Sequence, residues 1–572
     1  MLLISCVLLI ALLSNTASSF PTGYNVLFVA VDDMRPSIGA FNFSLAHTPH
    51  MDQLAADGLT FKRAFVQYAF CAPSRNSFMS GRRPDTTRVW NFQDHFREIG
   101  VGDQWQSLPE YFKNHGYVTA GSGKLYHPTV PPNNDWPKSW TTGNTNGTNN
   151  TNSTNSTSFA RYYSPECMPP RCPNSIPPKG NTQAGNKPSG IFHCVNGDPP
   201  PLGPAAKLRS TSCPANTSAD EARFEYQLED QRIRDSCVDQ LESLAEQEKP
   251  FFLGCGFHKP HVPWEYPQEF LQHYPSDLND IPLAKDVHAP IDMPQVAWHY
   301  PADVHGFKNV FNGTCNATRS RVFRRSYYAA ITYTDYNIGR LLQKVDQLGL
   351  TNTTAVVVFG DHGWQLGEHA TWAKMTNFEV ALRTPLIIKI PWKKQSHGKV
   401  TNVLAEAVDL YPTLVEAVGL PPPRSVGEEI NGTSLYSVFD TIALQEGPQE
   451  KRGKVLGLKN AAYAQFAKPS KANPFQFWPA PSRNATEIMG YTVRVDEWRY
   501  TCWFGFDKVH IVPLRNEILG RELYDHRGDN GELDWKGEHV NVVKNPEHEK
   551  LVKMLHQMIL DYIQLYPVTK YM

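Results

Sequence analysis

Neither sign of charge is in excess in this sequence, which holds 55 lysine and arginine residues against 56 aspartate and glutamate residues. With a formal net charge of -1 the chain has no overall field that would attract a polyanion, so nucleic acid is not expected as a partner. Charged residues are only 19% of the chain and hydrophobic residues are 41%, a balance that excludes intrinsic disorder. No internal repeat is present. These absences indicate a globular protein that holds any acidic ligand with local groups.

Cysteine is also scarce, because ten cysteines among 572 residues are too few for a disulfide scaffold. They are enough for a few disulfide bonds in an oxidising compartment. Within a proline-rich segment we expect Cys194 to pair with Cys213, where a local bond costs little closure entropy. Cys255 lies in an apolar run and is expected to be a core thiol. Cys315 and Cys502 have no evident partner in the sequence.

The long apolar run at the N-terminus, residues 2–13, is shorter than the ~20 residues that a membrane span needs. Small residues follow it at 17–19, so residues 1–19 are predicted to be a cleaved signal peptide, with an uncleaved anchor as the alternative. Eleven Asn-x-Ser/Thr sequons also favour the secretory pathway. We therefore expect a glycoprotein with no stable membrane association after cleavage.

Apolar, β-branched runs recur between helical stretches, at residues 25–31, 117–120, 251–255, 355–359 and 385–390. This alternation predicts an α/β fold with a mostly parallel sheet covered by helices on both faces. Ligands of such sheets lie beyond the carboxyl ends of the strands. Polar residues follow several of these runs and are expected to converge on one crevice: Asp32, Asp33, Lys124, His127, His258, Asp361 and His362.

The remaining segments suggest two domains. Residues 141–158 consist almost entirely of Asn, Thr, Ser and Gly and read as a flexible glycosylated loop. Three prolines at 421–423 follow a helical pattern and mark a border, so we predict a catalytic domain at 20–425 and a smaller α+β domain at 426–572. In the second domain, 491–495 and 499–504 are predicted neighbouring strands and 546–563 an amphipathic helix.

The segment CAPSR at 71–75, followed by Gly81 and Arg82, carries the strongest chemical signal. Pro73 suits the first turn of a helix, which would place Cys71 near the positive end of that helix. Taken alone, the pattern also fits a buried structural cysteine.

The same segment resembles the signature of the sulfatase family, and similarity in motif order extends from residue 25 to about 381. The segments GRRPDTTR at 81–88, GKLYHP at 123–128, FHKPHVP at 257–263 and DHGWQLGEHATWAK at 361–374 resemble the branch that removes 2-sulfates from uronates of heparan and dermatan sulfate. The resemblance implies an alkaline-phosphatase-like fold, a sulfated glycosaminoglycan substrate and delivery to the lysosome, with secretion as a further possibility.

The resemblance implies that the formylglycine-generating enzyme converts Cys71 to formylglycine, whose hydrate is the nucleophile. One hydroxyl attacks sulfur, and the second, once deprotonated, expels sulfate. It further implies that Arg75 stabilises the nucleophile, that Lys124 binds sulfate and that His127 removes the proton. His258 and Lys374 are placed on the leaving-group side. With an ordinary histidine pKa of ~6.5, His258 would be protonated near pH ~5, where activity is expected to peak.

A single divalent cation is the other expected cofactor. Asp32, Asp33 and Asp361 offer hard oxygen ligands that suit Ca²⁺ or Mg²⁺, and Ca²⁺ is the ion we expect. His362 occupies the fourth position of the family's ligand set, although imidazole is a poor match for a hard cation. Without the resemblance, an aspartate pair fits a helix cap equally well.

Several other residues have two interpretations, in the sugar pocket or in packing: Lys259, His261, Trp364, His369, Trp372, Arg82 and Arg83. Three alternative functions also stay open. A phosphatase of the same superfamily would carry Ser or Thr at the nucleophile and two metals. A sulfatase for another sugar would share the catalytic residues. A non-catalytic glycan-binding protein would lack at least one of them, and none is missing here.

Overall fold

The computed structural model describes residues 23–141, 228–300, 311–441, 458–476, 480–529 and 536–568. The predicted signal peptide, nearly all of the predicted glycosylated loop and the predicted Cys194–Cys213 pair lie outside these residues.

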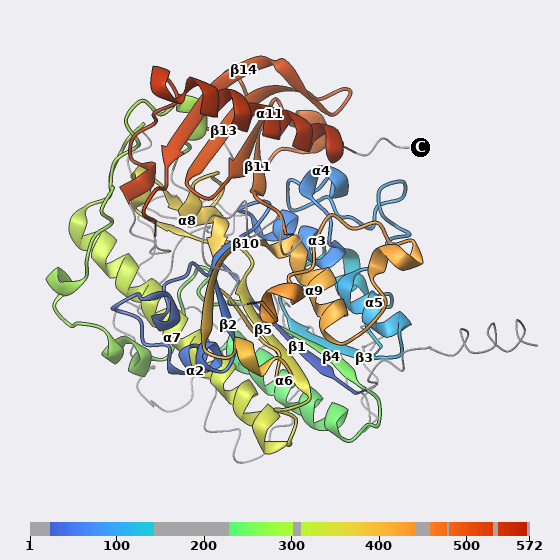
Figure 1. Ribbon diagram of the computed structural model, residues 1–572. Helices are drawn as coiled ribbons and strands as arrows, with labels where there is room; N and C mark the ends of the chain where they lie inside the picture. Colours follow the sequence, from blue (N-terminus) through green and yellow to red (C-terminus); the bar gives the residue numbers. More distant parts are fainter. Residues whose placement is uncertain are drawn as a thin grey trace, which may run out of the picture.

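A mixed, mostly parallel sheet forms the centre of the molecule, in the order β10-β2-β9-β5-β1-β4-β3, with β8 paired to β2 (Figure 1). The neighbours of β1 are both parallel to it, whereas β9 runs antiparallel to β5 and β2. The strands are β1 (Asn25–Val31), β2 (Leu59–Phe65), β3 (Val118–Gly123), β4 (Phe251–Phe257), β5 (Thr354–Gly360), β8 (Arg383–Thr384), β9 (Leu386–Lys389) and β10 (Lys399–Glu406). The predicted fold class is confirmed. Strands β2 and β10 were not anticipated.

Alternate residues of β1 point to opposite faces of the sheet and enter two separate cores. Each of these cores is covered by helices. Val29 packs in the core formed with α2 (Pro49–Ala56), α6 (Glu229–Ala245) and α7 (Ala317–Gln347). Phe28 packs in the core formed with α3 (Cys71–Ser80), α5 (Leu108–Asn114) and α9 (Leu410–Ala417). In the described part of the chain, no helix has the length and apolar character to cross a membrane.

A second, antiparallel sheet of four strands forms the C-terminal part, drawn in orange to red in Figure 1. Its strands are β11 (Ala462–Lys468), β12 (Ile488–Arg494), β13 (Trp498–Asp507) and β14 (Val512–Asp525), and α11 (Glu549–Leu565) packs against β12 and β13. The predicted neighbouring strands and final helix are therefore confirmed. The border at residues 425 and 426 stays a prediction.

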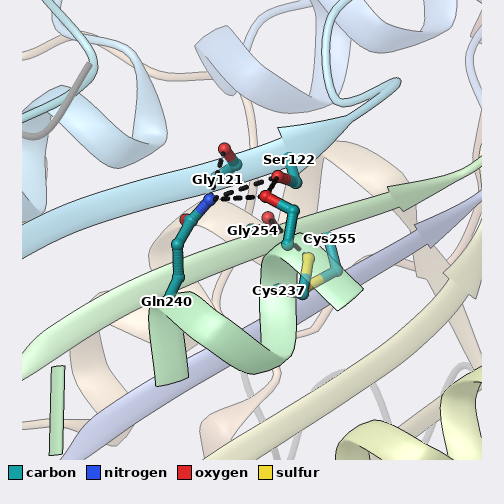
Figure 2. The surroundings of a disulfide bond; sticks show 7 residues. Gly121, Ser122, Cys237, Gln240, Gly254 and Cys255 are labelled. Atoms are coloured by element: carbon teal, nitrogen blue, oxygen red, sulfur yellow. Dashed lines mark hydrogen bonds between the residues drawn. A yellow bond between two sulfur atoms is a disulfide. The ribbon is translucent and has the colours of Figure 1, made fainter. Parts of the chain in front are cut away.

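The prediction for Cys255 is wrong, because its sulfur is bonded to that of Cys237 (Figure 2). Cys255 does lie in a buried strand, β4, but α6 packs across that strand and brings Cys237 against it. The sequence did not indicate this pair, because Cys255 lies in an apolar run typical of a core strand and Cys237 lies on a different element. Among the described cysteines, Cys71, Cys315 and Cys502 are free thiols.

Candidate active site

Cys71 is the first residue of α3 and is fully buried. Pro73 lies in the first turn, where its missing N–H costs no helical hydrogen bond. The thiol sulfur lies 3.3 Å from Asp32 Oδ1, 3.3 Å from His362 Nε2 and 3.0 Å from Lys374 Nζ. Burial raises the pKa of the Cys71 thiol to about 11. The sulfur therefore sits, as a neutral thiol, at the centre of a dense cluster of charged groups.

The acidic half of this cluster comes from the ends of two neighbouring strands. Asp32 and Asp33 follow β1, and Asp361 follows β5, which is parallel to β1, so their carboxylates meet at one edge of the sheet. The backbone N–H of Asp33 donates to Asp361 Oδ1 at 3.0 Å. His362 Nε2 lies 3.3 Å from Asp33 Oδ1 and 3.6 Å from Asp361 Oδ1.

These residues fit a divalent cation. Ligand atoms of Asp32, Asp361, His362 and Cys71 all lie within 4.8 Å of one another. Asp33 Oδ2 is buried and has no hydrogen-bond partner, which is costly for a carboxylate unless a cation satisfies it. His362 Nδ1 lies 2.9 Å from the Gly363 carbonyl oxygen, so its Nε2 faces the carboxylates.

The pKa values of the adjacent carboxylates diverge. Burial and the neighbouring Asp32 hold the pKa of Asp33 well above its ordinary value, although Lys374 opposes this. Burial acts in the same direction on Asp32, but Lys124 and other cations hold its pKa well below the ordinary value. Two carboxylates side by side resist ionising together, and a bound cation would remove that conflict.

The basic half of the cluster surrounds the same sulfur. Arg75 Nε donates to Asp361 Oδ2 at 3.0 Å, and Lys374 Nζ donates to Asp33 Oδ1 at 2.5 Å. Lys124, which follows β3, donates to Asp32. Burial acts against the charge of both lysines, yet the aspartates raise the pKa of Lys124 and of Lys374 above the ordinary value. Three fixed cations beside one nucleophile can stabilise the oxygens of a sulfate group.

The histidines complete the cluster. His127 stacks on Phe92 with ring centroids 4.2 Å apart, and His258 stacks on His261 at 4.7 Å. His258 Nε2 lies 4.0 Å from Asp32 Oδ2, and His261 Nε2 lies 3.9 Å from Asp33 Oδ2. Burial lowers the pKa of all three histidines well below the ordinary value, with Lys124 adding to the effect. The assumption of an ordinary pKa for His258 is therefore not supported.

The structure also separates the residues that had two interpretations. Arg82 and Arg83 are buried and pair with Glu428 at 2.5 Å and with Glu406 at 2.6 Å, so they stabilise the fold. Lys259 Nζ donates to the Pro263 carbonyl at 2.7 Å. The two tryptophans of this group and its second histidine are buried in the segment that follows β5: Trp364, Trp372 and His369. Only His261 of this group points its imidazole at a predicted metal ligand.

Two acidic residues beside the cluster were missed by the sequence reasoning. Glu229 and Asp230 begin α6, and their carboxylates contact the segment that holds His258. In the sequence they look like an ordinary acidic first turn of a helix, which favours the helix dipole. The sequence has no signal that distinguishes such a helix start from acidic residues that lie beside an active site.

Comparisons with known proteins agree with this geometry. The sulfatase family model matches residues 24–420. The chain is 34% identical to mouse iduronate 2-sulfatase over 87% of this chain and 88% of that protein. It is 34% identical to human iduronate 2-sulfatase over 90% of this chain and 91% of that protein.

The fold is shared more widely. The phosphonate monoester hydrolase of Agrobacterium radiobacter aligns with a TM-score of 0.64 at 19% identity, over 95% of this chain and 96% of that one. Since the family model covers well over half of the sequence and both relatives match along most of their length, the chain belongs to the sulfatase family, whose members hydrolyse sulfate esters.

Proposed function

We propose that this sulfatase removes the 2-sulfate from iduronate residues of heparan sulfate and dermatan sulfate. The observation that carries the reaction class is the position of the Cys71 sulfur, within 3.3 Å of acidic and basic side chains at once. The identity of 34% to two iduronate 2-sulfatases over most of the chain supports the choice of sugar.

Asp32, Asp33 and Asp361 would hold one Ca²⁺, with His362 as the fourth ligand. When bound, the cation supplies Lewis-acid polarisation of a sulfate oxygen and lowers the pKa of a coordinated hydroxyl. The protein's own cations act with it. Arg75 is held between Asp361 and Asp32, 3.0 and 3.7 Å away, and so faces the nucleophile.

A formylglycine at position 71, formed from Cys71 by the formylglycine-generating enzyme, would supply a geminal pair of hydroxyls for attack and for expulsion of sulfate. Lys124 and Lys374 then bind sulfate oxygens from two sides. His127 accepts the proton, which suits its lowered pKa because burial keeps it neutral. We assign to His258 the delivery of a proton to the sugar oxygen as the sulfur–oxygen bond breaks, although burial lowers its pKa as well. Lys374, whose pKa the aspartates raise, assists on that side.

The wider setting is part of the same proposal. The N-terminal apolar run and the eleven sequons support entry into the secretory pathway, where the modifying enzyme acts. We place the mature protein in the lysosome, with a secreted form as a second destination.

The test combines mass spectrometry, metal analysis and kinetics on the secreted protein. We expect the Cys71 peptide to carry the aldehyde or its hydrate, and about one Ca²⁺ per chain. At acid pH, kcat/KM is expected to be higher for a 2-sulfated iduronate disaccharide than for glucosamine 6-sulfate or an aryl sulfate.

Each outcome identifies one alternative. A higher kcat/KM for a competing sulfated sugar would make this a sulfatase for another substrate. Binding of sulfated glycans without turnover, with an unmodified Cys71, would make it a glycan-binding protein. Stoichiometric Zn²⁺, or active enzyme without metal, would overturn the proposed Ca²⁺ site.

A further inference from the structure

The start of α6 is attached to the segment that carries His258 at several points. Asp230 accepts hydrogen bonds from the backbone N–H groups of His258 and Lys259 at 2.7 and 2.8 Å. Two turns further along the helix, Cys237 is bonded to Cys255 of β4, the strand that ends immediately before His258 (Figure 2). These links place the first residue of the helix, Glu229, in a defined position relative to the imidazole.

Glu229 contacts the side of the His258 ring that faces away from the nucleophile. Its Oε2 lies 3.2 Å from His258 Nδ1, while His258 Nε2 lies 4.0 Å from Asp32 Oδ2 on the opposite side. The His258 side chain is 9% exposed and that of Glu229 is 25% exposed, so the contact is largely shielded from water. The ring therefore spans from the helix start to the catalytic cluster.

We infer that Glu229 is a positioning residue that holds His258 so that the proton delivered to the leaving sugar oxygen is carried by Nε2. This inference rests on the proposed function, in which His258 acts on the leaving group. A hydrogen bond at one imidazole nitrogen decides the orientation and tautomer of the ring, and hence which nitrogen faces the substrate. In the reaction, the N–H proton moves from Nε2 to the sugar oxygen, which keeps the electron pair of the broken sulfur–oxygen bond, while the Glu229 carboxyl passes its proton to Nδ1, so the imidazole stays neutral.

The surroundings of Glu229 support a shared proton at Nδ1. Burial raises the pKa of Glu229 to about 7, so in acid this carboxyl can hold a proton on the line between Oε2 and Nδ1. Lys259 Nζ lies 3.4 Å from the same nitrogen but also donates to the carbonyls of His261 and Pro263. The charged groups that act on the Glu229 carboxyl are Lys259, Asp230, Lys124 and Arg232.

The test compares leaving groups that do and do not need a proton. A sugar alkoxide needs protonation as it leaves, whereas an acidic phenol such as 4-nitrocatechol leaves without it. Glu229→Ala should lower kcat for the sulfated disaccharide by about tenfold or more, with KM little changed, and should lower kcat for 4-nitrocatechol sulfate by less than about threefold. Glu229→Gln keeps a side-chain N–H that can donate to Nδ1, as the protonated carboxyl does, so it should recover part of the loss.

Two further variants make the comparison specific. Glu242→Ala removes an exposed carboxylate of the same helix, which pairs with Lys344 at 2.7 Å, and should leave both substrates unaffected. In a His258→Ala background, Glu229→Ala should add no further loss, because the two residues act through one proton.

The outcomes separate this inference from the function on which it rests. A parent enzyme that hydrolyses neither sulfate ester overturns both. An active parent whose Glu229 variants lose both substrates equally, or lose neither, overturns the positioning role alone. Should Glu229→Ala fail to fold, the nearly isosteric Glu229→Gln carries the same test, and an equal loss on both substrates again contradicts the inference.

Discussion

Burial changes the pKa of Cys71 and strengthens the electrostatic interactions of the side chains around it. Burial raises the pKa of the Cys71 thiol to about 11, so the unmodified residue is a neutral thiol and a poor nucleophile in acid. The same burial concentrates three cations and three carboxylates around one atom, where electrostatic interactions are stronger than in water.

Cys71→Ser should fold normally and lose turnover by on the order of 10³-fold or more. A serine hydroxyl can attack sulfur but has no second hydroxyl with which to expel sulfate. Steady-state and single-turnover kinetics check this, with a thermal midpoint as the control for folding. Turnover near the parent rate, together with an unmodified Cys71 in the parent, would contradict the aldehyde mechanism.

Arg83→Lys should destabilise the fold and leave substrate binding alone. Arg83 makes two hydrogen bonds to the buried Glu406 carboxylate, at 2.8 and 2.6 Å, and lysine cannot reproduce that fork. We expect a loss of about 1–3 kcal/mol in the free energy of unfolding, measured by denaturant titration, and an unchanged KM for the proposed uronate substrate. Arg527→Lys, at an exposed pair with Asp525, is the control. A raised KM without loss of stability would return Arg83 to the sugar pocket.

At the scale of elements, one helix caps another. Helix α2 lacks a side-chain cap from its own N-cap residue, Thr48. Asp335 of α7 takes that place, because it accepts from the backbone N–H groups of His50 and Met51 at 3.2 and 2.7 Å. Burial raises the pKa of Asp335 to about 7. This cap therefore holds a proton in acid, unlike an exposed aspartate.

The free energy of unfolding of the Asp335→Asn variant should increase relative to that of the parent as the pH rises. Between the unfolded pKa of ~3.9 and the folded pKa of about 7, only the folded parent holds the proton, so its stability falls with rising pH. The variant has no such dependence. From pH 5 to pH 7 the difference in unfolding free energy should shift by about 2 kcal/mol toward the variant. Denaturant titrations at both pH values measure it, with the exposed cap variant Asp277→Asn as control. A difference in unfolding free energy that is the same at both pH values, or that shifts toward the parent at pH 7, would contradict this prediction.

At the scale of the molecule, a buried ionic cluster joins the C-terminal sheet to the loop that carries Lys374. Glu379 of α8 (Glu379–Leu382) contacts Arg494 of β12 at 2.7 Å and Arg499 of β13 at 2.6 Å. Asn377, close to that loop, donates to the Gly490 carbonyl of β12 at 3.1 Å. The second sheet therefore supports the catalytic cluster although it supplies none of the predicted catalytic residues.

Glu379→Ala should cost about 3–5 kcal/mol of stability, because it leaves three buried arginines with only two carboxylates, those of Asp529 and Glu538. Burial acts to raise the pKa of Glu379, but Arg494 and other cations hold it well below the ordinary value. Its stabilisation is thus complete above the unfolded pKa of ~4.3 and is lost only in stronger acid. The loss should be equal at pH 5 and pH 7, as measured by denaturant titration. Glu517→Ala, at an exposed pair with Lys471, should change little, and an equally small loss for Glu379→Ala would contradict the bridging role.

Local signals in the sequence were sufficient for much of the fold and the site. Apolar runs predicted β1, β3, β4, β5 and β9, because a strand buried on both faces needs them. They missed β2, because Lys62 and Arg63 interrupt its apolar residues. In the structure Lys62 donates to the Ala40 carbonyl at 2.7 Å and Arg63 pairs with Asp496, so both charges are satisfied while buried.

The sequence by itself determined which chemical groups are available: Cys71 before a helix-starting proline, aspartates at strand ends, and the lysines and histidines of the family motifs. Only the tertiary structure decided which groups meet. Glu406 is 323 residues from the Arg83 that it neutralises, and Glu229 reaches His258 only because α6 packs on β4. Partner choice and pKa depend on distance and on exclusion of water, and both arise when distant segments pack together.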